Sequence, residues 1–295
     1  MKSYQPYVQT FVPTRQCMND EVMLIENIPV EGTFPKGGLI SLWTLNRPDK
    51  LNSLNSESHK ALKEACNMAE SNDSIRVIVI TGASPNPPPE GKKAKPFSFA
   101  AGADISEFVG KNSDDVREFF EDNAWERVWN LSKPTIAMID GFALGGGTEL
   151  ALSCDIRIAS NRSKFGTPEI NLGLIPGGGG TQRLCRLVGY GKALEMVLTG
   201  EMLDSEEALS CGLVNSVTSP ENLKQTTMRL AENIANKSPY TTKVAKRAVR
   251  ASLDLPFSEG VLMERSEFVA LFDTEDKEIG VNAFLNRESP EWLGK

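Results

Sequence analysis

The sequence has little of several features that define common classes of protein. Only one of its 295 residues is histidine, and no two of its five cysteines form a CxxC pair. A zinc site or a disulfide framework is therefore not expected. No apolar run reaches the length of a membrane span. The net charge of −7 disfavours nucleic-acid binding, which needs a basic surface. We therefore expect no metal, nucleic-acid or membrane partner.

The scarcity of histidine also narrows the possible catalytic chemistry. His59 follows polar residues in a predicted helix, which favours a structural side chain that is solvated or partly buried. General acid and base work then falls to carboxylates, lysine, tyrosine or cysteine.

The chain divides into three regions by pattern. Residues 1–20 are predicted to form a flexible arm, residues 21–215 an α/β core and residues 216–295 a helical region. The arm lacks an apolar signal core and has only Lys2 and Arg15 as cations. The predicted location is therefore the cytoplasm, with the mitochondrial matrix as the alternative in a eukaryote.

Strand and helix patterns alternate along the core, which favours an α/β fold. Strands are predicted at residues 21–28, 38–45, 75–82, 135–139 and 156–159, and a helix at residues 56–71. Between them, residues 84–96 form an irregular loop that is first rich in proline and then basic.

The segment GGGTE, residues 145–149, is a candidate site for an oxyanion. Glycines at the start of a helix leave N–H groups unpaired, and the helix dipole favours negative charge there. Glu149 lies in the first turn of that predicted helix. Taken alone, the segment also fits a tight turn with a solvated glutamate.

Two other segments are less specific by themselves. FAAGAD, residues 99–104, also fits a packed turn whose Asp104 caps a helix. Four glycines at 177–180 lose much conformational entropy on ordering, which favours a loop whose backbone contacts a ligand or water. Trp125 and Trp129, four residues apart, are predicted to be core residues or to line an acyl pocket.

These segments, with FGTPEINLGLIPGGGGTQR at 165–183, resemble in order and spacing the enoyl-CoA hydratase/isomerase (crotonase) superfamily, and most of all its enoyl-CoA hydratases. The likeness extends to LNRPDKLNSL at 45–54, LTGEMLDSEEALSCGLVNSV at 198–217 and FDTEDKEIGVNAFLNRESP at 272–290. The resemblance implies an α/β, crotonase-like spiral of β-β-α units with a C-terminal helical region used in trimerisation.

The resemblance also implies roles for individual residues. Glu149 and Glu169 would be the paired catalytic carboxylates. Ala103 and Gly146 would donate the two N–H bonds of an oxyanion hole, and Gly177 would hold the catalytic water through its N–H.

Recognition of coenzyme A follows the family pattern only in part. The Leu51 neighbourhood and Ala101 would line the adenine end of the CoA site. Many members have a lysine where this chain has Ser106, and the loop at 84–96 is longer than usual. We expect Lys92, Lys93 and Lys95 of that loop either to replace the missing phosphate contact or to be solvated.

The predicted function is a 2-enoyl-CoA hydratase, or 3-hydroxyacyl-CoA dehydratase in reverse, with syn addition or removal of water. No cofactor is expected, since the CoA thioester is the substrate. Two carboxylates around one water favour a hydratase over a Δ3,Δ2-enoyl-CoA isomerase, which can run on one carboxylate. A non-catalytic or RNA-binding protein of the same fold is a further alternative, which the acidic charge disfavours. A homotrimer or homohexamer is expected.

Overall fold

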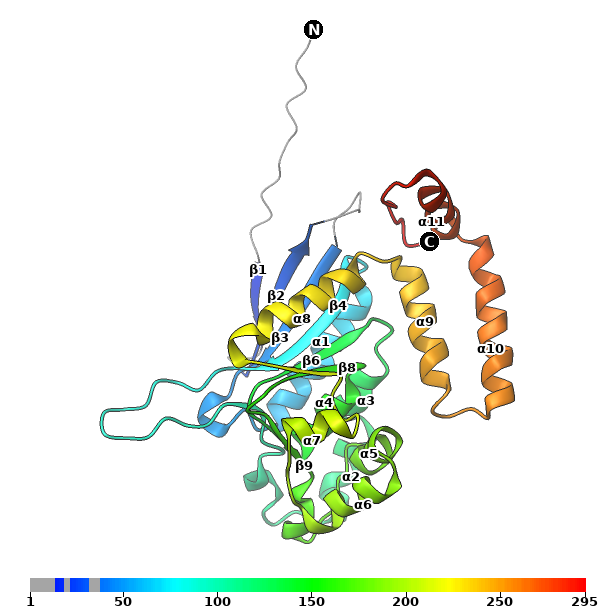
Figure 1. Ribbon diagram of the computed structural model, residues 1–295. Coiled ribbons are helices and arrows are strands. Elements are labelled where there is room, and N and C mark those ends of the chain that lie inside the picture. Colours follow the sequence, from blue (N-terminus) through cyan, green and yellow to red (C-terminus); the bar gives the residue numbers. More distant parts are fainter. Residues whose placement is uncertain (1–13, 19–21, 32–37) are drawn as a thin grey trace.

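The computed structural model describes residues 14–18, 22–31 and 38–295. In this part of the chain, two sheets form the centre of the molecule (Figure 1). The larger sheet has the strand order β1-β2-β3-β4-β6-β8-β11, and the smaller has the order β10-β9-β7-β5.

The strands are β1 (Thr14–Met18), β2 (Met23–Val30), β3 (Gly38–Leu45), β4 (Ile75–Gly82), β5 (Ser98–Ala100), β6 (Thr135–Ile139), β7 (Phe142–Leu144), β8 (Ile156–Ser160), β9 (Lys164–Gly166), β10 (Leu203–Asp204) and β11 (Ser216–Thr218). The α-helices are α1 (Ser56–Ser71), α2 (Ser113–Glu121), α3 (Ala124–Trp129), α4 (Gly146–Ser153), α5 (Gly180–Val188), α6 (Tyr190–Thr199), α7 (Ser205–Ser210), α8 (Pro220–Ala235), α9 (Pro239–Ala251), α10 (Phe257–Ala270) and α11 (Glu275–Asn286). Short 3-10 helices are η1 (Pro48–Lys50), η2 (Ile105–Phe108), η3 (Pro168–Leu172) and η4 (Leu271–Asp273).

From β4 to β9, consecutive strands alternate between the two sheets. The chain passes from β4 to β5, from β6 to β7 and from β8 to β9, each time leaving the larger sheet for the smaller one. Neighbouring strands of these successive turns are parallel, as in the pairs β4–β6, β6–β8, β5–β7 and β7–β9. This arrangement confirms the predicted spiral of β-β-α units.

Both faces of the larger sheet are buried, because successive side chains of a strand point to opposite faces. Val77 and Val79 of β4 pack on the side of α8, whereas Ile78 and Ile80 join the core on the side of α1. Burial on both sides explains the unbroken apolar run of β4, which is typical of parallel sheets.

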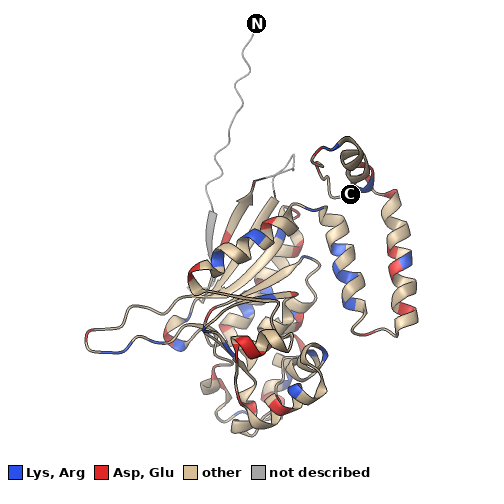
Figure 2. Cartoon of the chain, viewed as in Figure 1, with Lys and Arg blue, Asp and Glu red and all other residues tan. Residues whose placement is uncertain are grey.

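The C-terminal helices lie beside the sheets. In Figure 1, α9 and α10 extend away from the body of the molecule and α11 folds back near the start of α9. Helix α9 carries four cations and no acidic residue, as the blue bands in Figure 2 show. Exposed apolar side chains are common along α10 and α11, including Phe257, Leu262, Phe268, Val269, Phe284 and Leu285.

Two predicted boundaries differ from the structure. Residues 14–18 of the predicted arm form β1, which pairs antiparallel with β2, whereas the rest of that arm lies outside the described residues. Residues 216–218, assigned to the helical region, form β11 and pair with β8 of the larger sheet. Short strands that complete a sheet carry too few residues for a clear period-2 pattern. Among the described residues, no helix is both long and apolar enough to cross a membrane.

Candidate active site

Glu149 is placed by the turn between β7 and α4. Gly145 has a φ of 51° and its N–H donates to the carbonyl of Gly166, so the chain reverses tightly before the helix begins. The Thr148 hydroxyl donates to the carbonyls of Ala143 and Gly166 and anchors the first turn. Glu149 therefore projects from a fixed backbone, and its side chain is buried.

The glycine loop, residues 177–180, holds one oxygen of this carboxylate. The N–H groups of Gly178 and Gly180 donate to Glu149 Oε1 at 2.7 and 2.8 Å. A Cβ on Gly180 would lie 2.8 Å from the same oxygen, which explains the need for glycine there. The pKa of Glu149 is raised to about 7: burial and, less strongly, the nearby Glu169 raise it, whereas the two N–H donors and Arg183 oppose the rise.

Glu169 belongs to η3 and lines the same cavity as Glu149. Its Oε1 would be 2.8 Å from a Cβ on Gly145, so the carboxylate lies against the turn that precedes Glu149. Its Oε2 is buried and has no hydrogen-bond partner among the described residues. Burial raises the pKa of Glu169 as well. The structure thus brings the two predicted carboxylates to one site but gives them different surroundings.

The two predicted oxyanion donors are neighbours. A Cβ on Gly146 would lie 3.6 Å from the amide nitrogen of Ala103. Gly146 opens α4, where an N–H has no acceptor within the helix. Within the described part of the chain, the N–H of Ala103 likewise has no protein acceptor, although the flanking Gly102 carbonyl and Asp104 N–H both bond to Leu54. Both donors border the cavity that Glu149 and Glu169 line.

That cavity has a volume of about 940 Å³. Much of its wall comes from residues 105–125. The apolar residues that line it are Ala101, Ala103, Ile105, Phe108, Val109, Val116, Phe120, Trp125, Pro168, Leu172, Leu174 and Ile175. A long apolar cavity with a few polar groups at one point is typical of a small-molecule site.

The remaining predicted site residues are spread around this cavity. Gly177 and Ala101 line it, and the Ala101 N–H donates to the carbonyl of Leu51. Lys92, Lys93 and Lys95 do not line it: their loop extends away from the body of the molecule (Figure 1). Lys95 instead donates to the carbonyl of Asp49 at 2.5 Å.

The sequence did not decide whether Trp125 is a core residue or a pocket residue. Its indole N–H donates to the Gly146 carbonyl at 2.8 Å, and a Cβ on Gly178 would lie 2.4 Å from its ring. One side chain therefore touches both Gly146, the predicted oxyanion-hole glycine, and the glycine loop. The i, i+4 spacing of the tryptophans indicated packing but could not indicate which backbone atom the indole would meet.

His59 is more deeply buried than the solvated or partly buried side chain that the sequence predicts. It is 3% exposed and lies edge-on against Phe119 and Trp125, with ring centroids 4.6 and 4.5 Å away. Burial lowers its pKa to about 4, so it is neutral at physiological pH. Among the residues that the structure describes, no cluster of histidine, cysteine or acidic side chains could hold a metal ion.

A spiral of β-β-α units with one buried and one half-buried carboxylate beside two backbone donors defines a class of acyl-thioester enzymes, and the chain belongs to the enoyl-CoA hydratase/isomerase family, which matches residues 36–295. This finding confirms the resemblance drawn from the sequence.

Particular relatives are similar over most of their length. A probable enoyl-CoA hydratase from Rhizobium meliloti is 44% identical over 257 residues, covering 86% of this chain and 95% of its own. A short-chain-enoyl-CoA hydratase from Clostridium acetobutylicum is 38% identical over 271 residues, covering 91% and 98%. The crystal structure of an enoyl-CoA hydratase from Bacillus anthracis aligns with a TM-score of 0.80 at 33% identity, covering 92% and 99%.

Proposed function

We propose that the protein is a 2-enoyl-CoA hydratase, equally a 3-hydroxyacyl-CoA dehydratase in the reverse direction. The observation that carries the proposal is the pairing of Glu149 and Glu169 across one cavity, beside the free N–H groups of Ala103 and Gly146. The similarity to hydratases from two bacteria supports the same activity.

The two backbone donors would stabilise the charge that develops during the reaction. Attack of water on C3 of an enoyl thioester moves electrons onto the thioester oxygen and forms an enolate. Ala103 and Gly146 would donate to that oxygen, and one such donor is typically worth roughly 10²- to 10³-fold in rate. Their rigid positions in a turn and a helix start mean that little reorganisation is needed.

The two carboxylates would then divide the proton transfers. Glu149 serves as the base, because its Oε1 is fixed by two N–H donors that favour the ionised form, while Oε2 remains available to water. Glu169 serves as the acid, because a buried carboxyl oxygen without a partner favours the protonated form.

In the forward direction the water gives one proton to Glu149 as its oxygen bonds to C3, and Glu169 gives its proton to C2. The N–H of Gly177, on the cavity wall, is the proposed donor that holds this water. Proton exchange between the two carboxyls, directly or through solvent, restores the starting state.

Binding of the CoA portion supplies orientation rather than chemistry. Leu51 and Ala101 are the proposed neighbours of the adenine end, and Lys92, Lys93 and Lys95 are the proposed phosphate contacts. The reaction needs no cofactor, since the proposed groups carry all of its proton transfers.

Assembly into a trimer or a hexamer is proposed from the apolar side chains exposed on α10 and α11. The predicted compartment remains the cytoplasm, or the mitochondrial matrix in a eukaryote. Free thiols at Cys66, Cys154, Cys185 and Cys211 are consistent with a reducing environment.

The deciding experiment is hydration of crotonyl-CoA, followed by loss of the enoyl-thioester absorbance and by mass analysis of the 3-hydroxyacyl product. A 3-enoyl-CoA is supplied in parallel. Conversion of that substrate to the 2-enoyl isomer, without hydration of crotonyl-CoA, would identify an isomerase instead. Retarded RNA in a gel-shift assay, with neither reaction, would identify the non-catalytic alternative.

A further inference from the structure

The side chain of Arg183 occupies the inner side of the glycine loop. It leaves α5 and turns back so that Nη1 donates to the carbonyl of Gly178 at 2.7 Å. Gly179 has a φ of +94°, and a Cβ there would lie only 2.4 Å from the same Nη1. The guanidinium therefore fills the space beneath the turn, and the loop closes around it.

Both backbone groups of Gly178 are committed to charged partners. Its N–H donates to Glu149 Oε1, and its carbonyl accepts from Arg183. A hydrogen bond to an ionised donor is stronger and more directional than one between neutral groups. A shift of the guanidinium would thus move the carbonyl of Gly178 and, with it, the N–H that orients Glu149.

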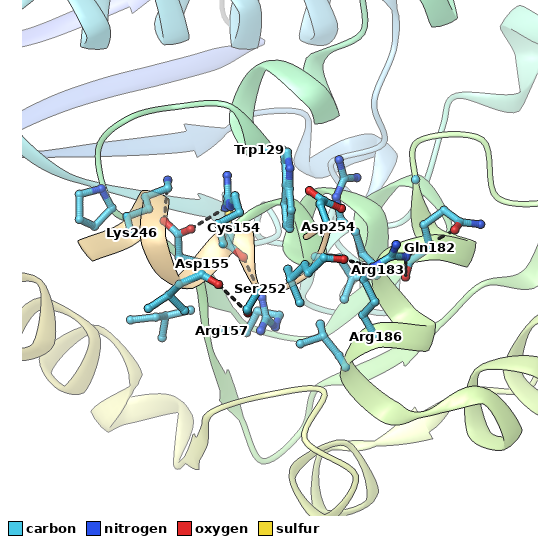
Figure 3. A pocket seen from close by; sticks show the side chains of 18 of the residues that line it. Trp129, Cys154, Asp155, Arg157, Gln182, Arg183, Arg186, Lys246, Ser252 and Asp254 are labelled. Atoms are coloured by element: carbon cyan, nitrogen blue, oxygen red, sulfur yellow. Dashed lines mark hydrogen bonds and ion pairs between the residues drawn. The ribbon is translucent and has the colours of Figure 1, made fainter. Parts of the chain in front are cut away.

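The ring of Trp129 stacks on Arg183 and also on Arg250. Its Cζ lies 4.6 Å from the ring centroid of Trp129, and Cζ of Arg250 lies 3.7 Å from the same centroid. Arg250 comes from α9 and donates to Asp155 at 2.6 Å. Trp129, Asp155 and Arg183, labelled in Figure 3, line a second cavity of about 820 Å³. Arg250 also lines it, and Glu149 does not. Stacking of guanidinium groups on an indole is favourable and restricts their orientation.

Few charged side chains influence the pKa values of Glu149 and Arg183. Glu149 is influenced by Glu169 of η3 and by Arg183 of α5. Arg183 is influenced in turn by Glu149, by Glu126 of α3 and by Arg250 of α9. Arg183 is thus the cation that lowers the pKa of Glu149 and offsets part of its burial.

We propose that Arg183 is a positioning residue for hydration. It fixes the glycine loop that orients Glu149, and Trp129, which also stacks on Arg250 of α9, holds the guanidinium in place. The inference rests on the proposed role of Glu149 as the base. If it holds, the second cavity and the packing of α9 influence catalysis, although neither borders the substrate cavity.

The test compares Arg183→Gln and Arg183→Lys with Arg186→Gln as a matched control. Arg186 is on the same helix and the same cavity wall, but it donates to Leu253 and Gln182 rather than to the glycine loop. Arg183→Gln should lower kcat for crotonyl-CoA by roughly 10- to 100-fold, as expected when a catalytic group is misplaced, with KM changed less than about 3-fold. Arg186→Gln should retain the kinetics of the wild type.

The pH profile separates positioning from a merely structural role. A base must be ionised, so kcat rises with pH through the pKa of Glu149. Loss of the cation raises that pKa, and the acidic limb of Arg183→Gln should move about half a pH unit or more toward higher pH. Arg183→Lys keeps the charge, so its limb should stay near that of the wild type while kcat recovers only in part.

Two further variants keep the proposal falsifiable if Arg183→Gln folds poorly. Arg183→Ala assayed with added guanidinium should regain activity. Trp129→Leu should lower kcat by a smaller factor when added to Arg183→Gln than when introduced into the wild type. A wild-type kcat with an unmoved limb in Arg183→Gln overturns the inference and leaves the hydratase assignment intact. A wild-type protein that hydrates no enoyl-CoA overturns the proposed function itself.

Discussion

Replacing Glu149 by glutamine separates the catalytic use of a carboxylate from the free-energy cost of burying one. The side chain is 2% exposed, and Gly178 and Gly180 donate to a single oxygen, Oε1. The amide oxygen of glutamine can accept the same two bonds, so the fold and the glycine loop should be retained. The variant cannot accept a proton from water, and kcat should fall by roughly 10²- to 10⁴-fold.

The same substitution should stabilise the protein at alkaline pH. The pKa of Glu149 rises from 4.5 to about 7 on folding, so the folded state binds this proton more tightly than the unfolded state does. The contribution of Glu149 to stability is therefore fully present below pH 4.5 and is lost as the pH rises through 7. The shift corresponds to roughly 3 kcal/mol, which is the upper limit of the advantage of Glu149→Gln at pH 8. At pH 4.5 the advantage should vanish.

Chemical unfolding at pH 4.5 and pH 8, alongside steady-state hydration of crotonyl-CoA, measures both effects. Glu118→Gln is a suitable control, because Glu118 is an exposed glutamate of α2 outside the cavity lining. Full hydratase activity in Glu149→Gln would refute the assignment of this residue as the base. An equal change of stability at both pH values would refute the electrostatic argument.

Glu169→Gln completes the comparison. It should also lower the hydration kcat by roughly 10²-fold or more, and the double variant should lose much less than the product of the two single losses, since both groups act on one water. In an isomerase, Glu169 would matter far more than Glu149. Near-wild-type hydration by either single variant contradicts the two-carboxylate mechanism.

Three further predictions concern the surroundings of the two carboxylates. Trp125→Phe removes the 2.8 Å hydrogen bond to the Gly146 carbonyl and should lower kcat by roughly 10-fold with little change in KM; a wild-type kcat would show that the indole does not position the oxyanion hole. Replacing Lys92, Lys93 and Lys95 together by alanine should raise KM for crotonyl-CoA at low salt and leave kcat unchanged, whereas an unchanged KM there would reduce these lysines to ordinary surface charges. Light scattering should give the mass of a trimer or hexamer. Phe284→Glu should weaken this assembly, because the side chain of Phe284 is 83% exposed and lies on the proposed interface. A wild-type monomer at micromolar concentration would contradict the assembly.

The parts of the fold that were predicted well carry a local signal. The helix expected at 56–71 coincides with α1, where Asn55 caps the N-terminus and the buried residues follow a helical period. The run at 75–82 coincides with β4 because burial on both faces demands an apolar residue at nearly every position. Strands β5, β7 and β10 have only two or three residues each and depend on neighbours far along the chain, so no local pattern could identify them.

The contacts inside the site could be predicted only as far as residue type. Four glycines at 177–180 indicated a loop whose backbone meets a ligand or water, but two of their N–H groups meet Glu149, 29 and 31 residues away. The burial of His59 also depends on distant residues, since Phe119 and Trp125 close over it from another part of the chain. Polar sequence neighbours describe the exposed face of a helix and say nothing of what covers the other face.

The proposed division of labour between the two glutamates depends on a property that belongs to the fold. Both residues follow a turn, so the sequence alone gives no reason to assign one as base and the other as acid. The glycine loop donates two N–H bonds to Glu149, and Arg183 adds a positive charge behind that loop, whereas Glu169 retains a buried oxygen without a partner. Burial raises the pKa of both carboxyl groups, and only that of Glu149 is opposed by the glycine loop and by a cation. It follows that variants which disturb the loop, rather than the glutamates, should alter the pH dependence of hydration.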